Sequence, residues 1–316
     1  MWMQILPYFL LVIGFVLLTL AADWLVDGAS ALAKRMDVPD LIIGLTIVAF
    51  GTSAPELVVS TLAAIDGNSD ISVTNVLGSN IINILIILGI SAIIYPVTMH
   101  SSTRMFEIPL SILAGIVVMI FYIIGSEELS RTEGIILLAI FVVFIIYSIH
   151  MARRGHADKM LDYKPIKPSK ALLLIVIGLA GLIIGGQFIV DSAVKIATAW
   201  GVPKSIIGAT IVAFGTSLPE LATSAMAAYK KHADLAIGNV VGSNIFNVFF
   251  ILGISAVITP IGRYENVYWD SFWTMCAATL LLLFGMGKKH QLQRLHGIVF
   301  ITCYAIYLGW LFYQIL

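Results

Sequence analysis

The sequence predicts an all-α polytopic membrane protein whose ten transmembrane helices form two inverted five-helix repeats. Three observations support this fold class. Of the 316 residues, 59% are hydrophobic and 11% are charged, whereas soluble domains carry roughly 25% charged residues. Ten stretches reach the length of about 20 apolar residues that a bilayer-spanning helix needs. Two segments of the first half also recur in the second half, at a fixed offset of 164 residues.

The first half of the chain contains five predicted spans. The apolar run after Met1 is too long, and its flanks are too poor in positive charge, for a cleaved signal peptide. We therefore interpret it as the first span. The five spans of this half cover about 5–33, 40–64, 71–96, 106–124 and 132–150.

A polar stretch over 151–170 divides the chain into a first repeat, 1–150, and a second repeat, 171–316. We expect it to be a cytoplasmic linker that determines topology, because it holds six basic residues: Arg153, Arg154, Lys159, Lys164, Lys167 and Lys170. The spans of the second repeat cover about 171–198, 204–228, 235–260, 268–286 and 295–314.

The distribution of Lys and Arg predicts the orientation in the membrane, because these residues concentrate in cytoplasmic loops. The loops after the first, third, fifth, seventh and ninth spans hold 14 of the 18 basic residues, and the opposite side holds four. We therefore expect both termini outside and the linker in the cytoplasm. The short loops are typical of a prokaryotic cell-membrane protein.

The recurring segments indicate how the two halves are related. Residues 44–62 and 208–226 are identical at 13 of 19 positions, and residues 75–96 and 239–260 are identical at 15 of 22. Because five spans is an odd number, the second half enters the membrane from the opposite side. Inverted repeats of this kind are typical of secondary transporters, with the binding site near the midplane where the repeats meet.

Each repeat carries one glutamate inside an apolar span, Glu56 and Glu220. An ionisable residue at membrane depth indicates a functional site. Pro55 and Pro219 precede these glutamates and break the helix hydrogen bonding, which is tolerated where the backbone faces a cavity. The neighbouring polar positions and the alanines one turn earlier share helix faces: Ala49, Thr52, Ser53, Asn75, Ser79 and Asn83, and in the second repeat Ala213, Thr216, Ser217, Asn239, Ser243 and Asn247.

All of these groups offer oxygen, which suits hard cations such as calcium. Two carboxylates neutralise one divalent ion, and the carbonyls and hydroxyls also suit sodium, but the same carboxylates could instead carry protons. Cys276 and Cys303 lie in late spans, and none of the six histidines has zinc-ligand spacing. We therefore expect no resident cofactor.

Some polar residues have simpler interpretations. Asn75 and Asn239 could equally be hydrogen-bonding links between helices. Asp27 and Asp191 fall near span ends, where solvation or helix capping is expected, and we expect the loop acids Asp66, Asp70 and Asp234 to be solvated. The alternative for the two glutamates is a structural carboxylate bonded to backbone.

The motifs GTSAPE and GTSLPE, followed by TNVLGSNIIN and GNVVGSNIFN, resemble the α-repeats of the sodium/calcium exchanger family, in the calcium/cation antiporter superfamily. The resemblance covers the whole chain and implies a four-site cluster. In it Glu56 and Glu220 bind calcium, helped by the carbonyls of Ala49 and Ala213 or the hydroxyls of Thr52 and Thr216. Central positions and sodium sites would come from Asn83, Asn247, Ser53, Ser79, Ser217 and Ser243.

The sequence also departs from relatives in the superfamily. Many archaeal and potassium-dependent members carry Asp where this chain has Asn247, so the resemblance argues against potassium dependence. The family's large cytoplasmic regulatory domains have no counterpart in the short linker. Proton-coupled relatives usually show GNxxE rather than GTSxPE, so the resemblance favours sodium as the counter-ion.

The leading hypothesis is a secondary antiporter that exchanges sodium for calcium by alternating access. The first and sixth helices, which are long and uninterrupted, would rock over the helices that carry the ligands. The alternatives are calcium/proton exchange and, from another class, a membrane enzyme or sensor; an enzyme would need a nucleophile–base pair or a metal cluster, and the sequence has neither. The expected partners are small inorganic cations and the lipid bilayer, with no nucleic acid and no obligate protein partner.

Overall fold

The computed structural model describes residues 2–124, 128–154, 166–201 and 213–315. Within these ranges, eight helices are long and apolar enough to cross a membrane, and a bent pair over 40–65 makes a ninth candidate. These nine coincide with nine of the ten predicted spans. The remaining prediction, 204–228, begins in 202–212, outside the described residues, as does the linker segment 155–165.

The helices of the first half follow the predicted spans closely. Three of the five spans contain short π-helical segments, written η, and the second is broken at Ser53. In order, the elements are α1 (Trp2–Arg35), α2 (Asp40–Ile43), η1 (Gly44–Val48), α3 (Ala49–Thr52), α4 (Ala54–Ile65), α5 (Ser69–Ile82), η2 (Asn83–Leu88), α6 (Gly89–Ile94), η3 (Thr103–Glu107), α7 (Ile108–Ile124) and α8 (Arg131–Arg154).

The second half repeats this order. Its described helices are α9 (Pro168–Ala199), α11 (Ala213–Gly215), α12 (Leu218–Tyr229), α13 (Ala233–Ile245), η5 (Phe246–Leu252), α14 (Gly253–Ile258), α15 (Val267–Gly285) and α16 (Arg294–Ile315). The π-helical segments η2 and η5 begin within one residue of equivalent positions, two to three residues after the GSN motifs. Such segments are often found at functional sites.

The prediction of an all-helical chain is incomplete, because four two-residue strands join the helix ends. They are β1 (Val97–Thr98), β2 (Glu128–Leu129), β3 (Ile261–Gly262) and β4 (Gln291–Leu292). β1 pairs with β4 and β2 pairs with β3, both antiparallel. Each strand of the first half thus pairs with a strand of the second half. The β1–β4 pair places the connection after α6 beside the one after α15. Strands this short leave no periodic pattern in the sequence.

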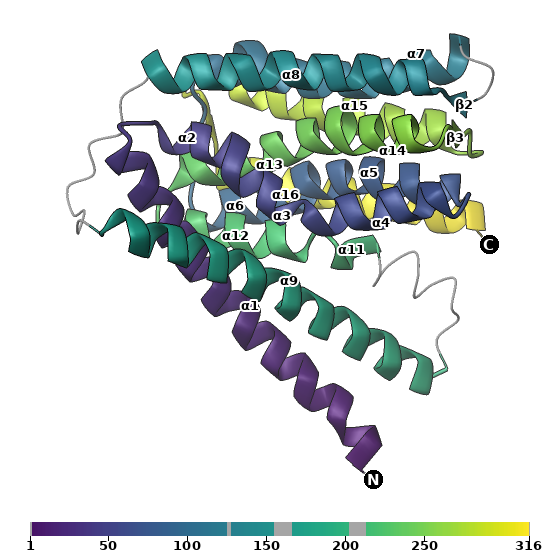
Figure 1. The fold of residues 1–316 in the computed structure, drawn as a ribbon, viewed down its shortest axis with the longest axis horizontal. Coiled ribbons are helices and arrows are strands. Elements are labelled where there is room, and N and C mark those ends of the chain that lie inside the picture. Colours follow the sequence, from purple (N-terminus) through teal and green to yellow (C-terminus); the bar gives the residue numbers. More distant parts are fainter. Residues whose placement is uncertain (1, 125–127, 155–165, 202–212, 316) are drawn as a thin grey trace.

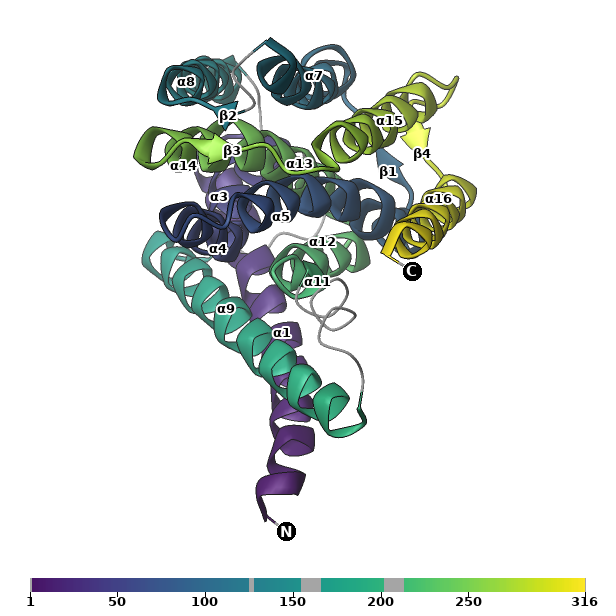
Figure 2. The same ribbon diagram turned by 90° about the vertical axis from the view of Figure 1, so that its right-hand side faces the viewer.

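Helices α1 and α9 lie on one side of the remaining helices, opposite α7 and α8 (Figures 1 and 2). They pack closely because glycines remove side-chain bulk at their crossing. A Cβ on Gly178 would lie 2.9 Å from the Ala21 carbonyl, and one on Gly185 would lie 3.0 Å from the Gly14 carbonyl. The pair approaches the other helices at one end and diverges from them toward the N-terminus of α1 and the C-terminus of α9 (Figure 1).

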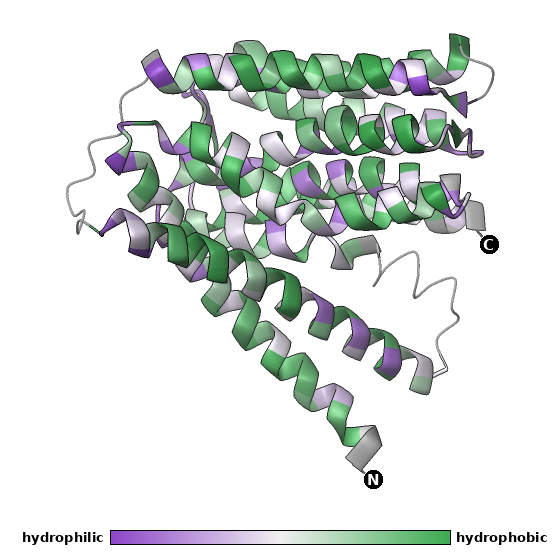
Figure 3. Ribbon diagram, viewed as in Figure 1, coloured by the Kyte–Doolittle hydropathy of each residue, from purple (hydrophilic) through white to green (hydrophobic). Residues whose placement is uncertain are grey.

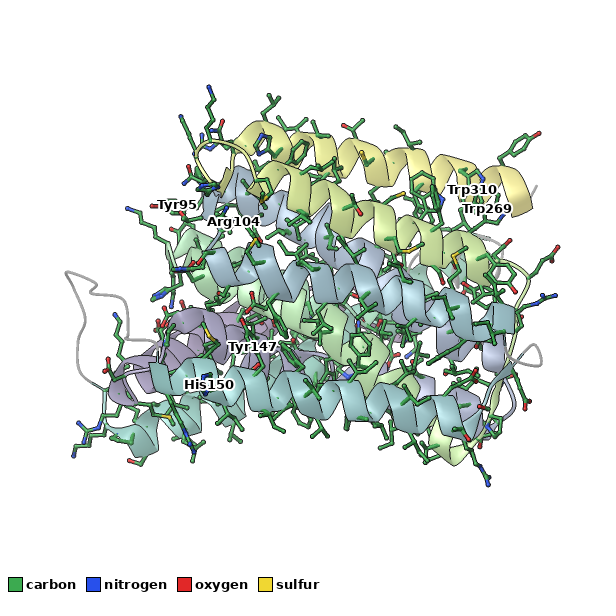
Figure 4. All side chains as sticks on the ribbon, turned by 90° about the horizontal axis from the view of Figure 1, so that it is seen from above. Tyr95, Arg104, Tyr147, His150, Trp269 and Trp310 are labelled. Carbon is green, nitrogen blue, oxygen red and sulfur yellow. The ribbon has the colours of Figure 1, made fainter. Side chains whose placement is uncertain are left out.

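The outer surface is apolar along the helices, with polar residues at their ends and in the interior (Figure 3). Aromatic and basic side chains mark the two ends (Figure 4). Tyr95, Arg104 and His150 lie toward one end, and Trp269 and Trp310, with ring centroids 5.7 Å apart, lie toward the other. Aromatic residues at both helix ends are typical of membrane–water interfaces.

Candidate cation-binding site

Two helix breaks position the glutamates. Helix α3 ends at Thr52, and α4 leaves at an angle of 49° from the preceding helix, with Pro55 and Glu56 in its first turn. In the second repeat, Ser217 precedes α12, whose first turn holds Pro219 and Glu220. Because a helix N-terminus carries partial positive charge, both breaks favour an ionised carboxylate at these positions. Both side chains are about 1% exposed.

Each carboxylate is held by hydroxyls from the other repeat as well as its own. Ser53 donates to Glu220 Oε1 at 2.8 Å, and the equivalent Ser217 donates to Glu56 Oε1 at 3.3 Å. Ser79 and Ser243 reach the glutamates of their own repeats at 3.4 and 3.5 Å. This reciprocal pattern brings both predicted glutamates and all four predicted serines into one cluster.

Four buried oxygens in this region have no hydrogen-bond donor: Glu56 Oε2, Glu220 Oε2, Asn83 Oδ1 and Asn247 Oδ1. A buried acceptor without a partner is costly, so a native structure needs a reason to keep it. A bound cation is such a reason, because carboxylate and amide oxygens are the ligands that calcium and sodium take. Within the described ranges, no group of three or more His, Cys, Asp or Glu side chains forms a metal site. The oxygen ligands of the cluster suit a hard cation.

Asn80 and Asn244 orient the two central asparagines, and the sequence analysis missed them. Asn83 Nδ2 donates to Asn244 Oδ1 at 2.9 Å, and Asn247 Nδ2 donates to Asn80 Oδ1 at 3.0 Å. The amides of Asn80 and Asn244 donate to each other's backbone carbonyls at 3.2 Å. These bonds use the donors of Asn83 and Asn247 and leave their oxygens free. The signal was present, since Asn80 and Asn244 occupy the same place in the duplicated GSN motif.

The threonines and the remaining asparagines form a second reciprocal layer. Thr52 donates to Asn239 Oδ1 at 3.1 Å, and Thr216 donates to Asn75 Oδ1 at 3.3 Å. Asn75 and Asn239 in turn donate to Ser60 and Ser224, at 2.8 and 2.9 Å. The interpretation of Asn75 and Asn239 as links between helices therefore agrees with the structure.

The two alanines lie at the same bends. The carbonyl of Ala49 accepts from the Ser53 N–H at 3.0 Å and from the Thr52 hydroxyl at 3.4 Å. Because the Ala49 carbonyl accepts these bonds within its own helix turn, it is less available as a cation ligand than the predicted helix break implied. Ala213 is the first residue of α11.

Several acids outside the cluster have partners that the sequence did not predict. Asp234 is not simply solvated, because His100 Nε2 lies 3.1 Å from its Oδ2. Asp27 accepts from Lys230 Nζ at 2.6 Å, and Asp191 accepts from Gln187 at 2.8 Å. Neither aspartate belongs to the cation cluster.

A cavity of about 720 Å³ lies between α9 and the two broken helices. Its wall includes Pro55, Pro219 and Thr216 at the helix breaks and Gln187 and Asp191 on α9. The cavity therefore reaches the helix breaks next to the two glutamates, on the side of α9.

Comparison with known proteins identifies the family of this chain. The family model described as sodium/calcium exchanger protein matches residues 6–150 and 170–313. The chain is 30% identical to the sodium/calcium exchanger MaX1 of Methanosarcina acetivorans, over 97% of this chain and 98% of that protein. It is 37% identical to the inner membrane protein YrbG of Escherichia coli, over 79% of each chain.

Solved structures of the sodium-calcium exchanger NCX_Mj have the same fold. The one soaked without sodium and calcium superposes with a TM-score of 0.84 at 33% identity, covering 97% of this chain and 99% of the other. The protein is thus a membrane antiporter of cations and not an enzyme, as its relatives are transporters. Its matched residues, fold and carboxylate cluster together show that the chain belongs to the sodium/calcium exchanger family.

Proposed function

We propose that the protein exchanges sodium for calcium by alternating access, with Glu56 and Glu220 as the charged ligands of one shared site. The observation that carries this proposal is the reciprocal bonding of two buried carboxylates, each with one oxygen left without a donor. Their combined charge of −2 matches one calcium ion. Membrane relatives named for sodium and calcium support the choice of ions.

The neutral oxygens complete the coordination in this proposal. Calcium takes six to eight oxygens, more than two carboxylates supply. The additional ligands would be the amide oxygens of Asn83 and Asn247 and the hydroxyls or carbonyls at the two bends. Sodium would use the same carboxylates together with these groups: Thr52, Thr216, Ala49, Ala213, Ser53, Ser217, Ser79 and Ser243. Shared ligands make the two ions compete, which is the condition for exchange.

The proposed architecture is two inverted repeats, 1–150 and 171–316, joined by 151–170, with both termini outside. Strands of one half pair with strands of the other, and Ser53 and Ser217 each bond the glutamate of the opposite half. These reciprocal contacts support a pseudo-two-fold relation. Movement of the α1–α9 pair would open the site first to one side and then to the other.

Calcium uptake into proteoliposomes tests this function. We expect uptake to require sodium inside the vesicles and to remain at background in sodium-free buffer with an imposed pH gradient. The converse result would support calcium/proton exchange, since the two carboxylates could also carry two protons. A lack of flux under either gradient, from protein that is monodisperse and folded, would contradict antiport of calcium.

Acidification should inhibit calcium transport. Protonation of Glu56 or Glu220 removes negative charge that calcium needs, so calcium and protons compete for the same oxygens. At subsaturating calcium, we expect uptake to fall as the pH is lowered from about 8 to about 5. Added calcium should relieve the inhibition. Initial rates measured over a grid of pH and calcium check this, and rates that are insensitive to pH would contradict glutamate ligands that exchange protons with the solvent during the cycle.

The asparagines that orient the central amides should also matter for affinity. Asn80→Ala or Asn244→Ala frees the neighbouring amide to rotate, and loss of an orienting group typically costs about 10–100-fold in metal affinity. We expect the half-saturating calcium concentration to rise by about tenfold in each variant. Asn68→Ala is the matched control, because Asn68 is exposed before α5 and caps that helix with no side-chain bond. Unchanged affinity in both test variants would rule out the orienting role.

A further inference from the structure

The two ends of the α1–α9 pair contact the other helices differently. At one end, the C-terminal half of α1 packs against α12 and the start of α2. At the other end, α9 borders the 720 Å³ cavity through Gln187, Asp191 and Val194. We call this arrangement closed beside α1, where the contacts are made, and open beside α9, where the cavity lies.

The turn between α12 and α13 holds α1 by polar contacts. Lys230 Nζ lies 2.6 Å from carboxylate oxygens of both Asp23 and Asp27, which are one helical turn apart on α1. The same amine lies 3.3 Å from the Asp23 carbonyl. In the same turn, His232 Nδ1 lies 3.1 Å from Ser30 Oγ on α1 and 2.8 Å from Asp40 Oδ2 on α2. The contacts of Lys230 with Asp23 and Asp27, and of His232 with Ser30, exist only while α1 lies against this turn.

The equivalent residues of the other repeat do not reproduce this pattern. At the offset of 164, Lys230 corresponds to Asp66, Asp27 corresponds to Asp191, and Asp23 corresponds to Gln187. Closure of α9 onto the turn after α4 would therefore bring Asp191 beside Asp66, where the other side has Asp27 beside Lys230, and the nearest base on α9 is Lys195, one turn further along. Among the described ion pairs none involves Asp66 or Asp191. The repeats share the fold and the site but differ in charge at these two ends.

We propose that Lys230, with Asp23 and Asp27, forms a one-sided ionic latch that stabilises the arrangement open beside α9. An interaction made in only one of two states shifts the equilibrium toward that state by its whole free energy. The latch sets the balance between the two faces of the exchanger, while the ligands at the site are common to both. This inference rests on alternating access as the proposed function.

Distances across the cavity test the latch. Val58 on α4 and Val194 on α9 both border the cavity, so nitroxides on cysteines there report whether it is open. Cys276 and Cys303 are first replaced by alanine, and retained calcium exchange checks that background. We expect Lys230→Met to lower the ratio of long-distance to short-distance populations by about three- to tenfold, since two partly exposed ion pairs are lost.

Lys231→Met is the matched control, because Lys231 is exposed in the same turn and has no ion pair among the described residues. It should leave the ratio unchanged. The double variant Lys230→Asp with Asp27→Lys restores an ion pair with exchanged signs and should recover part of the shift. An unchanged ratio in Lys230→Met, or an equal shift in Lys231→Met, would overturn the latch.

The same measurement separates failure of the latch from failure of alternating access. Wild-type protein in saturating sodium and in saturating calcium should populate two distances in different proportions. A single distance under every ionic condition would contradict alternating access itself. Two distances whose ratio is insensitive to Lys230 would contradict only the latch.

Discussion

Calcium exchange is expected to fall by about 100-fold or more in Glu56→Gln, and equally in Glu220→Gln. Glutamine keeps the size of the side chain and one carbonyl oxygen but removes the charge. One remaining carboxylate then leaves a divalent ion half-neutralised in a site that is about 1% exposed, where charges interact strongly. Because both carboxylates belong to one cluster, neither can substitute for the other.

Radioactive calcium uptake into sodium-loaded proteoliposomes measures this loss. Glu265→Gln is the matched control, because Glu265 is exposed in the connection before α15, outside the duplicated segments that carry the site residues. The control should transport at the wild-type rate, and size-exclusion profiles should be the same for all three variants. Flux near the wild-type level in either test variant would refute the shared site.

Calcium transport is also expected to depend on membrane voltage. With calcium bound, the two carboxylates bring the site to zero net charge, and with three sodium ions they bring it to +1. Asn83 and Asn247 add no charge. A cycle that exchanges one calcium ion for three sodium ions would therefore move one net charge across the membrane. Since moving one charge through 100 mV is worth about 2.3 kcal/mol, each ~60 mV should change the equilibrium calcium ratio about tenfold.

The sign of this effect follows from the direction of the extra charge. When calcium enters a vesicle and three sodium ions leave, net positive charge leaves, so a positive interior should accelerate uptake. Potassium gradients with valinomycin set the potential, and initial calcium uptake is measured at fixed sodium. An electroneutral cycle with two protons would show no such dependence. Uptake that is independent of voltage, yet driven by a pH gradient in sodium-free buffer, would overturn the sodium proposal.

Local sequence properties determined much of the fold. Apolar length predicted nine spans that the described structure contains, because a membrane helix satisfies its own backbone hydrogen bonds. Pro55 marked the break at Ser53 because proline lacks the N–H that a helix needs. The duplicated motifs identified Glu56, Glu220 and the four serines that the structure brings together.

The sequence did not reveal interactions whose partners are distant in the chain. The two-residue strands have no periodicity to detect, and their pairing depends on where four helix ends meet. Asn80 and Asn244 belong to the duplicated motif, but their contact with each other depends on how the two repeats pack. Lys230 pairs with Asp23 and Asp27 only because α1 lies beside the turn after α12.

The sequence by itself therefore determined which segments cross the membrane, where two of them bend, and which oxygen-bearing residues are duplicated. These properties depend on neighbours within a few residues. Only the tertiary structure decided that Ser53 bonds Glu220, that Asn244 orients Asn83, and that α1 is tied to the turn after α12. Those contacts join residues 161 to 203 positions apart, and their geometry arises from packing of whole helices, which no local pattern encodes.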